Sequence, residues 1–204
     1  DSIKVSFNLP SEASAAVFER GGVLWAVFDK PFALDPTGFQ AGGREISRRI
    51  RRVEQRLHED ALILRMNIRA NQNFIVERDV TTWHLYLKDT PAKPRFPLRP
   101  TRREDEVQGQ QIFIQASDVG RKIEFEDPDI GDLLVVLPVL RQSTGVAQKY
   151  NYAAAELLET SQGIAVSPLS DNVIVERFRD GVAIRATGNN LLSASRLSRS
   201  TGIG

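Results

Sequence analysis

The fold class of this 204-residue chain is best indicated by the residues Val17-Phe-Glu-Arg-Gly-Gly-Val-Leu-Trp-Ala-Val-Phe-Asp29. This stretch consists of two runs rich in β-branched and aromatic residues, on either side of the pair Gly21-Gly22. Glycine accepts positive φ angles without strain, and a tight hairpin turn between two strands requires such angles. The stretch therefore predicts a β-hairpin.

An alternating strand precedes this hairpin, and the same order of elements returns further along the chain. Apolar and polar residues alternate from Ile3 to Leu9 and again, for most of the way, from Leu62 to Ile68. Each strand is followed by a Glu-Arg pair, and a tryptophan stands five residues after each arginine. The residues concerned are Arg20, Trp25, Arg78 and Trp83. These are the only two tryptophans, so the shared offset predicts an internal repeat.

A third and more divergent unit begins at Ile164. It continues with Val173-Ile-Val-Glu-Arg177 and an Asp180-Gly181 turn, which is a strong hairpin signal. A strand from Val182 to Ala186 follows, with valine in place of tryptophan.

One amphipathic helix is predicted over residues 44–57, between the first two units. Ile46, Ile50, Val53 and Leu57 follow one another at steps of four, three and four, which places them on one helix face. Arginines, among them Arg48 and Arg52, occupy much of the remaining surface.

Prolines and arginines mark a predicted domain boundary. Four prolines recur at every third residue between Pro91 and Pro100, a spacing that favours extended polyproline II. The expected organisation is a β subdomain over 1–90, a linker over 91–107, a second β subdomain over 108–190 and a tail over 191–204. The linker-like tail indicates a piece of a longer protein.

The predicted fold is mainly β, with repeated hairpin units in a sandwich or an elongated stack and one amphipathic helix. A hairpin needs neighbours to bury its apolar side, which favours stacking. Propeller-like blades are the alternative architecture, since groups of three strands recur.

Composition narrows the function classes. Lys plus Arg (27) nearly balances Asp plus Glu (26), and a net charge of +1 gives no general attraction to nucleic acid or anionic lipid. No cysteine is present, which excludes disulfides and thiolate chemistry. No apolar run is long enough to span a bilayer. Without a recognisable nucleophile, phosphate or metal motif, the sequence predicts no enzyme and no cofactor.

Candidate binding residues are two tryptophans and two arginines. Trp25 and Trp83 suit sugar stacking or interface anchoring if their rings are exposed, although large aromatic residues more often fill the core. Arg48 and Arg52 suit anionic groups, although a charged helix face is commonly only solvated. The two histidines, His58 and His84, are expected to be structural, because neither has a catalytic partner in view.

Carboxylates cluster in the segment 124–132. Glu124, Glu126, Asp127, Asp129 and Asp132 present oxygen ligands of the kind that Ca²⁺ prefers. The same residues are also ordinary turn chemistry, and the calcium-loop pattern is missing. The segment thus stays open between a turn and a cation site.

The stretches Val17–Asp29, Phe125–Asp132 and Thr160–Val166 together resemble the N-terminal β-rich region of long tetratricopeptide-repeat proteins of alphaproteobacteria. The hairpin units also resemble, more distantly, the AMIN-type β modules that localise envelope proteins. The first resemblance implies a periplasmic or envelope-associated protein with a helical repeat array beyond Gly204. The expected function is a non-enzymatic binding and scaffolding module with a protein partner. A peptidoglycan-binding module and a carboxylate-based hydrolase are the alternatives.

Overall fold

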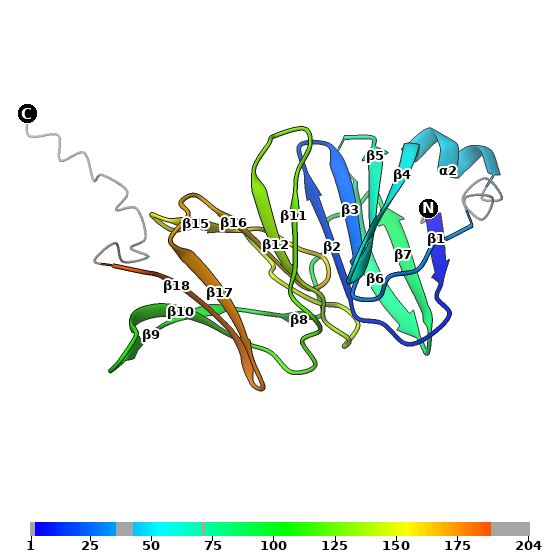
Figure 1. Ribbon diagram of the computed structural model, residues 1–204. Helices are drawn as coiled ribbons and strands as arrows, with labels where there is room; N and C mark the ends of the chain where they lie inside the picture. The colour runs from blue at the N-terminus through cyan, green and yellow to red at the C-terminus, as the bar shows by residue number, and fades with distance from the viewer. Residues whose placement is uncertain (1–2, 36–42, 71, 189–204) are drawn as a thin grey trace, which may run out of the picture.

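The computed structural model describes residues 3–35, 43–70 and 72–188 and confirms a mainly β, sandwich-like fold. Within these residues the only helix is the short α2 (Gly43–Arg49). Figure 1 shows the strands arranged as two β-sandwiches side by side, with α2 at the N-terminal end. The sheets lie face to face, as in stacked sandwiches and unlike the blades of a propeller.

The N-terminal sandwich consists of a three-stranded and a four-stranded sheet. The first contains, in order across the sheet, β1 (Ile3–Asn8), β7 (Thr82–Lys88) and β6 (Asn73–Asp79). The second contains β2 (Ala15–Arg20), β3 (Val23–Phe28), β5 (Ala61–Ile68) and β4 (Ile50–His58).

The C-terminal sandwich has the same plan. Its inner sheet contains β11 (Ile123–Glu126), β12 (Leu133–Leu137), β16 (Ile164–Pro168), β15 (Ala155–Leu157) and β14 (Tyr150–Asn151). Its outer sheet contains β17 (Val173–Phe178), β18 (Gly181–Ala186), β10 (Gly109–Gln115) and β9 (Pro100–Asp105). β8 (Phe96–Pro97) lies where the chain passes from the N-terminal to the C-terminal sandwich, and it forms a short parallel pair with β13 (Thr144–Gly145).

Three apolar clusters separate four stacked layers. One fills the N-terminal sandwich and a second fills the C-terminal sandwich. The third lies between the two sandwiches. There the β2-β3-β5-β4 sheet packs against the β11-β12-β16 sheet, each through the face turned away from its own sandwich core. The central strands of each middle sheet are therefore buried on both faces, whereas the edge strand β4 is largely exposed. This burial explains the uninterrupted apolar runs of β3 and β12, which an exposed sheet would not tolerate.

Within each sandwich, two strand-plus-hairpin units exchange their leading strands. β1 pairs with β7 of the second unit, and β5 pairs with β3 of the first. In the C-terminal sandwich, β10 pairs with β18 and β16 pairs with β12 in the same manner. Neither unit can complete its own sheet, so the two units of a sandwich fold together.

The structure thus contains a fourth unit that the sequence pattern does not reveal. It comprises β10 and the pair β11–β12. This unit has no Glu-Arg pair, and its two hairpin strands are joined by the acidic segment Asp127–Asp132 in place of a tight turn. The signals that mark the other three units are both missing here.

The predicted helix over 44–57 is wrong beyond Arg49. The segment Ile50–His58 is the edge strand β4, which pairs with β5 along its length and is interrupted by a bulge between Ile50 and Arg52. The open edge of β5 offers backbone hydrogen bonds, and this tertiary pairing overrides the helical spacing of the apolar residues. Leu57, predicted to be on the buried stripe, is 60% exposed as a result.

The predicted linker over 91–107 is also wrong in its second half. Residues Pro100–Asp105 form β9, an edge strand paired with β10. Proline is tolerated there because it stands first in an edge strand, where a missing N–H breaks no ladder bond that the sheet needs. The predicted tail, 191–204, lies outside the described residues.

Candidate functional site

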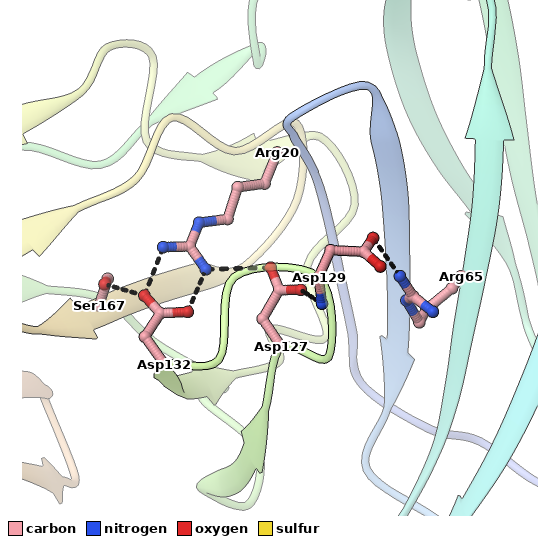
Figure 2. A network of polar contacts seen from close by, with 6 residues as sticks. All are labelled: Arg20, Arg65, Asp127, Asp129, Asp132 and Ser167. Carbon is pink, nitrogen blue, oxygen red and sulfur yellow. Dashed lines mark hydrogen bonds and ion pairs between the residues drawn. The ribbon is translucent and has the colours of Figure 1, made fainter.

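The acidic segment 124–132 is a joint between the two sandwiches (Figure 2). Arg20, at the end of β2, forms a bidentate pair with Asp132, with Nη1–Oδ1 and Nη2–Oδ2 distances of 2.6 and 2.5 Å. Its Nη1 also donates to Asp127 at 3.0 Å. Asp132 accepts a further hydrogen bond from the Ser167 hydroxyl at 3.0 Å. Hydrogen bonding from Arg20 lowers the pKa of Asp132 below its ordinary value.

A second arginine holds the tip of the same segment. Arg65 of β5 donates to Asp129 and, at 2.9 Å, to Glu54 of β4. Asp127 is 2% exposed and uses its other oxygen to accept the Asp129 N–H at 3.0 Å. The carboxylates of Asp127, Asp129 and Asp132 are therefore occupied by two arginines. Among the described residues, no group of three or more His, Asp or Glu side chains is placed to hold a metal ion.

Both tryptophans are buried, as large aromatic residues more often are, so Trp25 and Trp83 are not available as the candidate binding residues. Trp25 and Trp83 are each 1% exposed. Trp25 lies between the sandwiches, 5.3 Å from Phe125 and under the guanidinium of Arg65 at 5.0 Å. Trp83 lies inside the N-terminal sandwich, where its Nε1 donates to the Ala13 carbonyl at 2.9 Å. A sugar cannot stack on either ring in this structure.

The two predicted arginines do not form one site. Arg48 is an exposed residue of α2 that lines a hollow with Arg49, Arg69 and Asp89. Arg52 is not part of this lining; it follows the bulge in β4 and pairs with Glu54 at 2.7 Å. Arg48 and Arg52 lie apart because the segment predicted as one helix is a helix followed by a strand.

Each histidine makes one hydrogen bond to a neighbouring group. His84 Nδ1 lies 2.8 Å from the Ser6 hydroxyl across the β1–β7 pair, and burial lowers the pKa of its ring. His58, at the end of β4, accepts the Asp60 backbone N–H at 3.1 Å. The His84 contact links two paired strands that are far apart in the sequence, whereas the His58 contact lies within one turn.

The surface feature that sequence reasoning missed is a groove of about 530 Å³ beside β8, which we call the arginine groove. Its lining comes from β8, the end of β10, the loop after β12 and the β17–β18 turn. The residues are Arg95, Phe96, Pro97, Leu98, Gln115, Ala116, Ser117, Arg141, Thr144, Arg179 and Asp180. Its charged residues come from three separate parts of the sequence, so no local motif marks it. The one signal was the arginine-rich segment 91–107, which reads as a linker.

The arginines of this groove are exposed and unpaired. Within residues 3–35, 43–70 and 72–188, none of Arg95, Arg141 and Arg179 forms an ion pair with a carboxylate. The Arg141 guanidinium lies over the Phe96 ring, 3.5 Å from its centroid. Unpaired guanidinium groups that converge on a groove can bind carboxylate or phosphate oxygens.

Comparison with protein-family models, curated proteins and solved structures finds no match to this chain. In the described part of the chain, no helix has the length and apolar character needed to cross a membrane. The class of protein therefore rests on the architecture itself, a tandem pair of β-sandwiches joined face to face.

Proposed function

We propose that this chain is a non-enzymatic binding and scaffolding module of a larger bacterial envelope protein, where it mediates protein–protein contacts. The observation that carries the proposal is the arginine groove on the joined sandwiches. A module of this kind needs a stable body and a surface whose binding groups are left without internal partners. Balanced overall charge and a periplasmic setting, as the resemblance to envelope proteins implies, are consistent with this role.

The joint between the sandwiches supports a scaffolding role. The apolar cluster between the sheets, together with the Arg20 and Arg65 ion pairs, resists hinge motion between the two halves. Backbone hydrogen bonds add to this, since Val17 N–H donates to the Gln162 carbonyl at 2.9 Å. A rigid body holds the arginine groove in a set orientation relative to the rest of a longer protein.

Photo-crosslinking in the bacterium that encodes the protein tests this proposal. A photoreactive phenylalanine analogue replaces Phe178, which is 46% exposed and adjoins Arg179 of the groove, in the full-length protein. The matched control carries it at Leu169, which is 56% exposed and lies outside the lining of the groove. We expect a discrete protein adduct in the envelope fraction from position 178 only. A cytoplasmic protein, or the absence of adducts from both positions, would contradict the proposal.

A further inference from the structure

We infer that the arginine groove binds an acidic peptide segment, one that displays carboxylate side chains and belongs to the partner protein. The inference rests on the proposed function and deepens it, since it names the chemistry of the partner. Three observations carry it: a guanidinium held in position, a local excess of positive charge, and an aromatic ring whose face is already covered.

Arg141 is held in position at both its backbone and its side chain. Its backbone carbonyl accepts a hydrogen bond from Nε2 of the fully buried Gln162 at 2.8 Å. Its side chain stacks on Phe96, whose own backbone N–H donates to the Ser143 carbonyl at 2.9 Å. A stacked guanidinium keeps its N–H groups free at the edge, where a carboxylate can accept two of them. Little side-chain freedom is then lost on binding.

Positive charge is concentrated here although the whole chain carries only +1. The lining holds three exposed arginines, Arg95, Arg141 and Arg179, which come from separate parts of the sequence. Asp180 is the only acidic residue of the lining. Charge complementarity therefore points to an anionic partner and to an association that weakens with salt.

The groove favours a peptide over a nucleic acid. Single-stranded nucleic acids gain much of their affinity by stacking bases on exposed aromatic faces. The one aromatic ring of the lining, Phe96, is covered by Arg141. The polar side chains nearby, Gln115, Ser117 and Thr144, suit hydrogen bonds to a peptide backbone.

Fluorescence anisotropy with a labelled oligoglutamate peptide tests the inference on the intact chain. The groove variant is Arg95→Gln with Arg141→Gln. The matched control, Arg51→Gln with Arg56→Gln, removes the same charge from exposed positions of β4. We expect the groove variant to bind at least about tenfold more weakly, because each arginine–carboxylate hydrogen bond contributes about that factor. The control is expected to bind like the unaltered chain, and oligoglutamine is expected not to bind.

Two further probes separate the sources of negative charge. Oligothymidylate and phosphatidylglycerol vesicles are expected to bind more weakly than oligoglutamate, and without dependence on the groove. Equal loss of oligoglutamate binding in the groove and control variants would overturn the inference, and so would a groove-dependent preference for either alternative probe. A thermal melt of each variant verifies folding, and Arg179→Gln supplies a second groove variant from a separate turn.

The crosslinking and anisotropy results together distinguish a failure of this inference from a failure of the proposed function. If the crosslinked adduct at position 178 persists in the groove variant, the module still binds a partner but not through these arginines. If no adduct forms although oligoglutamate binds, the groove recognises carboxylates, but the proposed scaffolding role is contradicted.

Discussion

Gly163 occupies a position where both backbone angle and space exclude a side chain. It has a φ of +73° and lies just before β16, next to Gln162, which forms a β-bridge with Val17 of β2. A Cβ at this position would lie 2.8 Å from the Ala16 Cβ and 2.9 Å from the Ala15 carbonyl oxygen. The sandwiches approach this closely only because no side chain intervenes.

Gly163→Ala is therefore expected to lower the free energy of unfolding by about 3 kcal/mol, combining left-handed backbone strain with overpacking. Gly109→Ala is the matched control, because Gly109 has a φ of +75° and a methyl group added there would point into open space. We expect the control to lose only about 1 kcal/mol, from strain alone. Urea unfolding measures both values, and equal losses would contradict the close approach.

The Arg20–Asp132 pair makes the joint sensitive to acid. Because hydrogen bonding from Arg20 holds the pKa of folded Asp132 below its ordinary value, the carboxylate stabilises the fold above the unfolded pKa near 3.8. This stability is lost as pH falls through the lower, folded pKa. Asp132→Asn is expected to cost about 2 kcal/mol at pH 7, by loss of charged hydrogen bonds.

The cost of Asp132→Asn should shrink to near zero in strong acid, where the native carboxyl is also neutral. Urea midpoints across the acidic range, for the unaltered chain and the variant, test this. Glu106→Gln, at an exposed position, is the control for a lost negative charge. A difference that stays constant with pH would contradict the assignment.

At the scale of single elements, hairpin register decides which way each tryptophan points. In the first hairpin Arg20 pairs with Val23 across the Gly21-Gly22 turn, whereas in the second Asp79 pairs with Thr82 across Val80-Thr81. The shared Glu-Arg pair is thus shifted by one residue relative to the turn. A one-residue shift reverses the face of every side chain in a strand. Equal spacing in the sequence therefore places the two tryptophans in different clusters.

The second hairpin carries a strained turn residue. Val80 has a φ of +50° and is 70% exposed, and a β-branched residue is unfavourable in this region. Val80→Asn is expected to raise the free energy of unfolding by about 1 kcal/mol, because asparagine tolerates the left-handed region. Chemical denaturation tests it, with Val107→Asn at another exposed valine as control. A destabilised Val80→Asn variant would contradict the turn geometry.

At the scale of the whole molecule, two buried sheets face each other and tie the sandwiches into one structure. Trp25 lies at this interface beside Phe18 and Phe125. A shared apolar cluster of this kind couples the unfolding of the two halves. The unaltered chain is therefore expected to unfold in a single transition.

Trp25→Ala is expected to cost about 3–5 kcal/mol and to separate the unfolding of the two sandwiches into two transitions. Trp83→Ala is expected to cost a similar amount, but its two sandwiches should still unfold in one transition. Trp83 lies inside one sandwich, so its removal leaves the interface between the sandwiches intact. Calorimetry distinguishes the two variants. A single transition in Trp25→Ala would show that the polar contacts of the joint suffice for coupling.

Local sequence patterns predict the β class, the hairpin at Gly21-Gly22 and three of the four strand-plus-hairpin units. These are local properties, since alternation and turn chemistry act between residues close together in the chain. The patterns fail for β4 and β9, because an unsatisfied neighbouring edge, and not local propensity, makes those segments strands.

Three features depend on tertiary packing: the exchange of leading strands, the burial of both tryptophans and the arginine groove. Each depends on contacts between residues far apart in the chain, such as Phe96 with Arg141 or Arg20 with Asp132. Such contacts follow from the order in which sheets pair and stack, and no local sequence pattern encodes that order.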